Sequence, residues 1–431
     1  MDDLTRRGFL AGTAGTAAIV ATAGNTADAQ TISRRAPVAH HLPEPGKSGI
    51  DHIVVAMMEN RSFDHYLGWL PGADGRQAGL SFQDKNGVAH PTHHLTAPHG
   101  CGFHDPDHSY GGGRIEYNDG RCDGWLRAGA NDDLSIGYYQ SADLGFYGRA
   151  ARDWTVCDRY FAAVLGPTFP NRFFQNAGQT DRTSNTLTIS QVPTIWDRLK
   201  AKKLTGRYYF SDVPFTALWG AKHLDITRHI SSFYDDAKHG KLPSVSFVDP
   251  RLLGGEIGLS EDEHPLSDIR LGQHFLGKVY EAVTTSPNWE RTALVINYDE
   301  WGGFYDHVAP PVGPDPRPDL GTGLRGFRVP CLLISPRARR KAIAHEVYDH
   351  TSVLKMIEWR FGLAPLTVRD AAARNLAEVL DFAGKPNLKA PKYNVPAPVT
   401  FGCLDPNTTH TYNEDWARLR DTAAKFRFPV A

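Results

Sequence analysis

The sequence lacks an excess of charge of either sign. Its 431 residues include 47 Lys and Arg against 48 Asp and Glu, which gives a formal net charge of −1. Nucleic acid is therefore not an expected partner, because sequence-independent binding to phosphates needs a strong positive field. The sequence also lacks a hydrophobic run long enough for a transmembrane helix. Internal repeats and coiled-coil heptads are missing as well.

Cysteine is scarce, with five in the whole chain, and no pair has the spacing of a zinc site. An odd number cannot pair completely within one chain. Cys101 and Cys122 lie in a glycine-rich, loop-like region and form the predicted disulfide, provided that the protein reaches an oxidising compartment. Cys157 and Cys331 have apolar neighbours and are predicted to be core residues.

The N-terminus has the pattern of an export signal. A Thr-Arg-Arg-Gly-Phe-Leu motif at 5–10 precedes a mildly apolar stretch over 10–24, and Ala27 and Ala29 offer small residues for cleavage before Gln30. The segment has no polar face, which argues against an ordinary amphipathic helix. Residues 1–29 are therefore predicted to be a twin-arginine signal, with the twin-arginine machinery as partner and a periplasmic or secreted destination.

The mature chain alternates short β-branched runs with longer helical or loop segments, which is typical of an α/β protein. The apolar runs do not alternate strictly, as expected of strands covered on both faces. We predict one domain over 30–431 with a mostly parallel central sheet, helices on both faces, long loop insertions at 72–134 and 306–327, and a closing segment at 385–431. The expected strands are 53–57, 244–248, 293–296 and 329–334.

Oxygen-bearing side chains follow two of these runs in adjacent pairs. Glu59 and Asn60 follow the first, and Asp299 and Glu300 follow the third. Because ligands bind at the carboxyl ends of parallel strands, these pairs predict a site for a divalent metal ion whose identity the sequence does not specify. Capping of a following turn is the alternative; for Asp249, which comes before a proline, the two interpretations are equally good.

A candidate nucleophile lies in the segment 166–174. Thr168 stands where a helix N-cap is expected, with Pro170 in the first turn, so its hydroxyl would lie at the positive end of the helix dipole. Arg172 would add charge to a bound phosphoryl group. The alternative is that Thr168 only caps the helix. Candidates for proton transfer are the loop histidines His108, His264 and His307.

These motifs, taken together and in this order, resemble the phosphoesterase family of bacterial phospholipases C, which includes plant non-specific phospholipases C and a bacterial acid phosphatase. The resemblance covers almost all of the mature chain. It rests on Glu-Asn-Arg-Ser-Phe-Asp-His-Tyr at 59–66, Gly-Pro-Thr-Phe-Pro-Asn-Arg at 166–172, Asp-Glu-His-Pro at 262–265, Tyr-Asp-Glu-Trp-Gly-Gly-Phe-Tyr-Asp-His-Val at 298–308 and His-Thr-Ser-Val-Leu at 350–354.

The resemblance implies an alkaline-phosphatase-like fold and hydrolysis of a phosphoric ester through a covalent phospho-enzyme. It implies that Thr168 is the nucleophile, and that His264 and His307 contact the phosphoryl oxygens or protonate the leaving group, with His108 as a further partner. His350 would act behind the site at the start of a helix, and Asp306 would orient a loop. The implied metal ligands are Glu59, Asn60, Thr168, Asp299 and Glu300.

The threonine form of the motif is associated with the phospholipase C branch, so the expected substrate is a glycerophospholipid of the phosphatidylcholine type, cleaved to diacylglycerol and a phosphorylated headgroup. Among nearby aromatics, Trp125 and Trp301 are predicted to line the headgroup site by cation–π contact, with core packing as the alternative. The chain ends soon after the last motif, so only transient membrane-surface contact is expected. An acid phosphatase acting on monoesters, and a non-catalytic metal- or lipid-binding protein, are the alternative functions.

Overall fold

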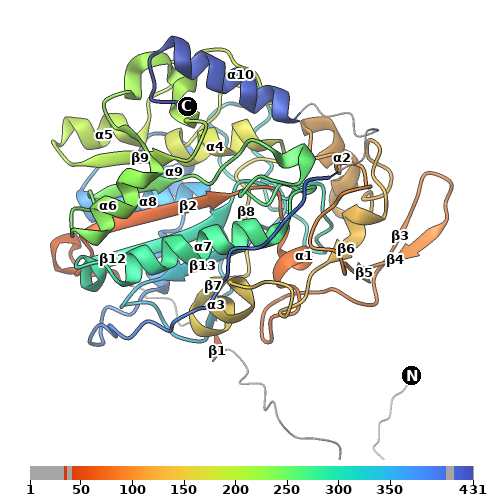
Figure 1. The fold of residues 1–431 in the computed structure, drawn as a ribbon, viewed down its shortest axis with the longest axis horizontal. Helices are drawn as coiled ribbons and strands as arrows, with labels where there is room; N and C mark the ends of the chain where they lie inside the picture. Colours follow the sequence, from red (N-terminus) through yellow and green to blue (C-terminus); the bar gives the residue numbers. More distant parts are fainter. Residues whose placement is uncertain (1–33, 36–40, 404–411, 431) are drawn as a thin grey trace, which may run out of the picture. The chain divides into compact units, whose positions relative to one another are not determined.

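The computed structural model describes residues 34–35, 41–403 and 412–430; the predicted signal at 1–29 lies outside them. A nine-stranded sheet is the centre of the fold (Figure 1). Its strands pair in parallel except at one strand, β13, which is antiparallel to both neighbours, so the predicted α/β fold with a mostly parallel sheet is confirmed. In order across the sheet the strands are β1 (Arg34–Arg35), β14 (Ala342–Ala344), β7 (Thr155–Cys157), β13 (Cys331–Ile334), β12 (Thr292–Tyr298), β2 (His52–Met58), β11 (Val245–Val248), β9 (Gly206–Phe210) and β10 (Thr227–His229).

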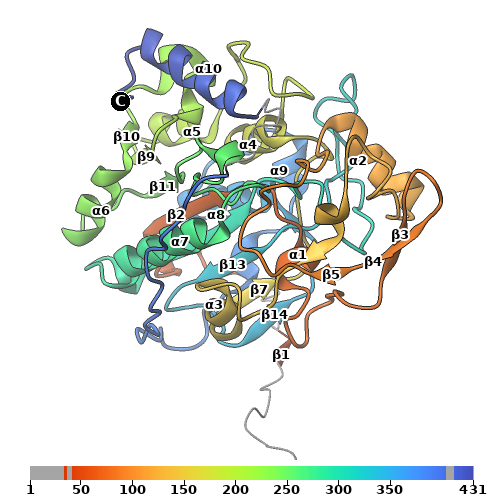
Figure 2. The same ribbon diagram turned by 45° about the vertical axis from the view of Figure 1, so that its right-hand side comes forward.

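Helices lie on both sides of this sheet (Figure 1 and Figure 2). α7 contacts β2 and β12 on one side, and α4 packs against α8 on the other. The helices are α1 (Phe63–Leu67), α2 (Tyr110–Tyr117), α3 (Tyr147–Asp153), α4 (Thr168–Ala177), α5 (Ile195–Ala201), α6 (Ile230–Lys238), α7 (Ile269–Thr284), α8 (His350–Phe361), α9 (Val368–Ala372) and α10 (Tyr412–Lys425).

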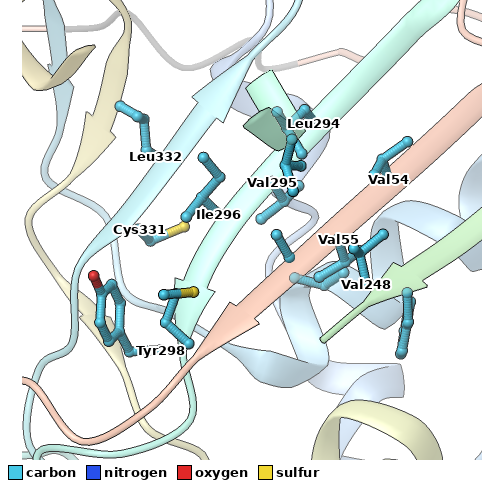
Figure 3. Close-up of a cluster of buried hydrophobic side chains, with 14 of the residues drawn as sticks. Val54, Val55, Val248, Leu294, Val295, Ile296, Tyr298, Cys331 and Leu332 are labelled. Atoms are coloured by element: carbon cyan, nitrogen blue, oxygen red, sulfur yellow. The ribbon is translucent and has the colours of Figure 1, made fainter. Parts of the chain in front are cut away.

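Aliphatic side chains on β2, β11, β12 and β13 form the core between these layers (Figure 3). Val54, Leu294 and Leu332 are fully buried, as is every residue of β12. Burial of each such side chain contributes about 1.5–3 kcal/mol. A strand that is apolar on both faces reads as a continuous hydrophobic run, which is why the sequence pattern located these strands without showing strict alternation.

The register of the sheet brings the ends of three strands together. Met58 of β2 lies opposite Tyr298 of β12, and Val248 of β11 lies opposite Ala56 of β2. The residues that follow these parallel strands therefore leave the sheet at one edge. β13 runs the other way, so the polar residues after it leave at the opposite edge.

The predicted insertions differ in content. The region 72–134 holds the short strands β3 (Ser81–Gln83), β4 (Ala89–Pro91) and β5 (His93–His94) together with α2, whereas 306–327 contains no helix or strand. Further two-residue strands are β6 (Gly137–Tyr138), β8 (Tyr160–Phe161) and β15 (Tyr348–Asp349). None of the helices in the described part of the chain combines the length and apolar character needed to cross a bilayer.

The predicted disulfide is wrong. Cys101 is bonded to Cys403, with the two Cα atoms 5.4 Å apart, and Cys122 is a buried free thiol. Both members of the expected pair do lie in the insertion 72–134, but the fold brings a residue from the C-terminal segment to Cys101, a contact that no local pattern indicates. Cys157 and Cys331 are free and buried, as predicted.

Loss of this bridge has a predictable effect on stability. We expect replacement of Cys403 by Ser to lower the free energy of unfolding by about 2–5 kcal/mol, because the bridge closes a very long loop. Replacement of Cys122 by Ser, the control, should cost far less. Alkylation in denaturant followed by non-reducing peptide mapping should find Cys101 joined to Cys403; a peptide that joins Cys101 to Cys122 would contradict the assignment.

Candidate active site

Four buried side chains meet at the edge where β2 and β12 end. Glu59, Asn60, Asp299 and Glu300 are all fully buried. The backbone N–H groups of Asn60 and Glu300 both donate to Asp299 Oδ1, at 3.1 and 2.6 Å. Asn60 has a φ of 61°, and a Cβ at Gly302 would lie 2.2 Å from its carbonyl oxygen, so only glycine fits there. The two acid pairs predicted from the sequence are thus one cluster.

Arg172 lies among these acids. Its guanidinium nitrogens are 3.0 Å from Glu59 Oε1, 3.1 Å from Asp249 Oδ1 and 3.3 Å from Asp299 Oδ2. Only 1% of its surface is exposed. The expectation that Arg172 binds substrate directly therefore needs correction, because its charge already joins three carboxylates. Asp249, left open between a turn and a functional role, belongs to this network.

Thr168 is the first residue of α4, and the N-cap position is taken by Pro167. Its Oγ is buried and has no hydrogen-bond partner among the described residues. Instead, Asn185 Oδ1 accepts a hydrogen bond from the N–H of Phe169 at 2.9 Å and so caps the start of α4. The interpretation of Thr168 as a capping residue is thus wrong. Thr168 and Arg172 are four positions apart and share one face of α4, which is the face turned toward the acids.

One of the predicted histidines, His108, lies beside Glu300, and a second, His264, lies next to His108. His108 Nε2 is 3.9 Å from Glu300 Oε1, and the rings of His108 and His264 are 5.9 Å apart. His264 Nε2 is 3.4 Å from Asp105 Oδ2. Asp105, His108 and Pro167 line a cavity of about 480 Å³. Asp105 was not singled out from the sequence, although it stands in the same His-Asp-Pro-Asp-His motif as His108 and could have been found there.

His307 has different partners. Its Nδ1 is 2.5 Å from Asp64 Oδ2 and its Nε2 is 3.1 Å from Asp74 Oδ1. Arg328, also fully buried, pairs with Asp64 at 3.1 Å and with Asp306 at 2.9 Å. No contact joins His307 to the acid cluster within the described chain, so the geometry does not support its expected contact with a phosphoryl group. Arg328 pairs with two carboxylates of this second cluster, which is a buried ion network, and Asp64, Asp306 and His307 also lie close enough together to hold a cation.

The tryptophans predicted to line a headgroup site are packed in the core. Trp125 and Trp301 are fully buried, and their indole N–H groups donate to Cys122 O at 2.6 Å and to Glu116 Oε2 at 2.7 Å. Both rings pack against Phe327. The packing alternative is therefore correct, because neither ring has a face left for a ligand.

His350 supports the site from behind, as expected. It is the first residue of α8, and its Nε2 lies 2.7 Å from the carbonyl oxygen of Asp299. Its Nδ1 lies 3.1 Å from the hydroxyl of Tyr160. Burial lowers the pKa of His350 to about 4, so the ring is neutral near pH 7 and holds the turn after β12 through hydrogen bonds.

The acid cluster has more negative charge than the basic side chains around it can balance. Burial, and next the charge of Asp299, raise the pKa values of Glu59 and Glu300 well above their ordinary range. Burial likewise raises the pKa of Asp299 to about 6, against the opposing charge of Arg172. With Asp249 included, four buried carboxylates face one guanidinium, an arrangement that favours either proton uptake or a bound cation.

The available donor atoms fit a divalent cation. Thr168 Oγ, Asn60 Oδ1 and Glu300 Oε1 are buried and accept or donate no hydrogen bond within the described residues. All the atoms of the cluster that could coordinate a metal are oxygens. Oxygen ligands suit a hard or borderline cation rather than a metal that prefers thiolates. The residues that would hold it are those predicted from the sequence: Glu59, Asn60, Thr168, Asp299 and Glu300.

Comparison with known proteins identifies the chain as a hydrolase of phosphoric esters. The family model described as Phosphoesterase family matches residues 50–364, and the chain belongs to this family. Non-specific phospholipase C6 of Arabidopsis thaliana is 31% identical over an alignment of 389 positions that covers 80% of this chain and 75% of that protein. Phospholipase C B of Mycobacterium tuberculosis is 31% identical over an alignment of 481 positions, gaps included, that covers 92% of this chain and 89% of that protein.

Solved structures are similar only in a general way. A protein in the alkaline phosphatase superfamily from Vibrio parahaemolyticus has a TM-score of 0.37 at 11% identity and covers 82% of this chain and 76% of its own. The phosphonate monoester hydrolase of Agrobacterium radiobacter has a TM-score of 0.39 at 9% identity, with 77% of each chain covered. Similarity at this level gives no information about the site.

Cation and proton should compete at the acid cluster. Without a cation, raised carboxyl pKa values mean that the folded chain binds more protons than the unfolded chain, so stability falls as pH rises. We expect the melting temperature of the chelated protein to fall between about pH 5 and about pH 7, and that of the Mn²⁺-loaded protein to fall less. Scanning calorimetry measures both, with Glu300→Gln as the variant that flattens the chelated profile. If the melting temperature changed with pH in the same way with and without Mn²⁺, cation binding at the acid cluster would be contradicted.

Proposed function

We propose that this chain is an exported, metal-dependent phospholipase C that cleaves a phosphatidylcholine-type glycerophospholipid to diacylglycerol and a phosphorylated headgroup. The observation that carries the proposal is the buried Thr168 hydroxyl, which has no hydrogen-bond partner in the described part of the chain. It lies on the helix face whose Arg172 pairs with the acids after β2 and β12. Relatives named phospholipase C support the activity, and the Thr-Arg-Arg motif at 5–10 supports export.

In the first step Thr168 Oγ bonds to phosphorus and the bond from phosphorus to the diacylglycerol oxygen breaks. The positive end of the α4 dipole lies at Thr168 and would stabilise negative charge on the phosphoryl oxygens. His264 or His108 gives a proton to the departing alkoxide. A divalent cation held by the acid cluster would ease loss of the Thr168 proton and offset charge on the phosphoryl oxygens.

In the second step water bonds to phosphorus and the bond to Thr168 Oγ breaks, which releases the phosphorylated headgroup. The histidine that lost its proton takes one from the attacking water. Thr168, whose proton passes to solvent in the first step, takes a proton back from solvent when its bond to phosphorus breaks. Asp105 beside His264 and Glu300 beside His108 orient the two rings for this exchange. Arg172 keeps Glu59 and Asp299 in place throughout both steps.

Replacement of Thr168 tests the nucleophile. We expect Thr168→Val to reduce turnover of p-nitrophenylphosphorylcholine at least about 10³-fold, because no other hydroxyl replaces the missing oxygen. Thr168→Ser should retain measurable turnover. Thr227→Val, which removes a buried hydroxyl at the far strand β10, is the control and should remain active.

The same assay distinguishes the substrate classes. Cleavage of the choline diester that stops with chelator and returns with added metal supports the phospholipase C assignment. Preference for p-nitrophenyl phosphate would assign the chain to the acid phosphatase branch instead. Full turnover by a folded Thr168→Val variant would refute the nucleophile whatever the substrate.

Replacement of each of the three histidines should affect kcat and the melting temperature differently. We expect His108→Gln and His264→Gln to lower kcat by about 10²-fold or more, since these rings lie beside the acid cluster. His307→Gln should lower kcat much less and act mainly on the melting temperature, because it breaks the network of Asp64 and Arg328. A His307→Gln variant as impaired in kcat as His264→Gln, at an unchanged melting temperature, would overturn this ranking.

A further inference from the structure

The C-terminal helix α10 reaches the start of the helix that carries Thr168. α10 lies outside residues 50–364 that the family model matches. It packs mainly on the segments Phe215–His223 and Gly255–Ile257, and two of its residues, Asp415 and Trp416, lie beside Asn185 and Phe169. Their contacts are independent of one another, because one is polar and the other aromatic.

Trp416 covers the outer side of the nucleophile turn. Its side chain is fully buried, and its ring centroid is 5.1 Å from that of Phe169, the residue after Thr168. The Arg172 guanidinium carbon lies 5.6 Å from the centre of the same indole ring. One side chain of α10 thus contacts both the neighbour of the nucleophile and the cation that joins Glu59 to Asp299.

Asp415 acts on the same turn through Asn185. Its carboxylate interacts with the side chain of Asn185, whose Oδ1 accepts from the Phe169 N–H at 2.9 Å. Asp415 and Asn185 both line the cavity of about 480 Å³, as do Pro167 and His108. Because Asp415 holds Asn185 in place, Asn185 can cap the start of α4 without the Thr168 hydroxyl.

The disulfide keeps α10 near the start of α4. Cys403 precedes α10 in the chain and is bonded to Cys101, which comes shortly before Asp105 and His108. The covalent link therefore fixes the C-terminal segment to the loop that supplies a wall of the cavity. Such a link raises the effective concentration of α10 at its docking position beside the start of α4.

We propose that α10 is a clamp on the nucleophile helix, in which Asp415 and Trp416 are positioning residues that set the orientation of Thr168 and Arg172. The inference rests on the proposed function, since it concerns the turnover of that site. Displacement of a reacting group by about 1 Å can cost up to about 100-fold in rate, so loss of either contact should slow the phosphoryl transfer step.

The test compares paired variants of the full-length protein. We expect Asp415→Ala and Trp416→Ala to lower kcat for p-nitrophenylphosphorylcholine about tenfold, with a much smaller change in KM. Asp415→Asn keeps an acceptor oxygen for Asn185 and should restore most of the activity. Asp421→Ala, on the exposed side of α10, and Trp289→Ala, a buried tryptophan elsewhere in the core, are the matched controls.

Hydrogen exchange gives a second readout that does not depend on turnover. We expect peptides over 167–173 to exchange faster in Asp415→Ala than in wild type and to be unchanged in Trp289→Ala. Equal kcat values for Asp415→Ala, Asp415→Asn and wild type, with unchanged exchange over 167–173, would overturn the clamp alone. Failure of wild type to cleave any phosphoester would instead refute the proposed function, while faster exchange in Asp415→Ala would still support the clamp.

Discussion

The arrangement of buried charge around Arg172 is the constraint on which the site depends. Glu59, Asp249 and Asp299 come from the ends of three parallel strands, and one guanidinium from α4 pairs with all of them. Carboxylates buried this close together are unstable unless a cation compensates them. Arg172 therefore ties the nucleophile helix to the sheet, and the remaining negative charge creates the demand for a divalent ion.

The sheet makes this concentration of charge unavoidable. β2 and β12 are apolar on both faces, and their pairing fixes Met58 opposite Tyr298. A slip by one residue would separate the acids that follow and would also reverse the faces of every core side chain. The hydrophobic core of the sheet thus determines the register, and the register determines the geometry of the acid cluster.

The sequence predicted what depends on local pattern and on the direction of parallel strands. The fold class, the acid pairs and the place of Thr168 at the start of a helix follow from such signals, although the predicted N-cap position belongs to Pro167. The roles of Arg172 and His307 did not, because each depends on which distant acids the fold brings to a charged side chain. The pairing of Cys101 with Cys403 also depends on a contact made only in the folded chain.

The Thr168 hydroxyl could either cap the start of α4 or remain without a hydrogen bond, and the structure around it favours the second. A threonine at a helix start ordinarily uses its side chain to cap the first turn, which would occupy the oxygen that attacks phosphorus in the proposed mechanism. Here Pro167 takes the N-cap position and Asn185 accepts the Phe169 N–H. The helix start is satisfied by another residue, and Thr168 Oγ stays available at the positive end of α4. The choice of capping residue, made outside the strands, therefore decides whether this threonine is structural or reactive.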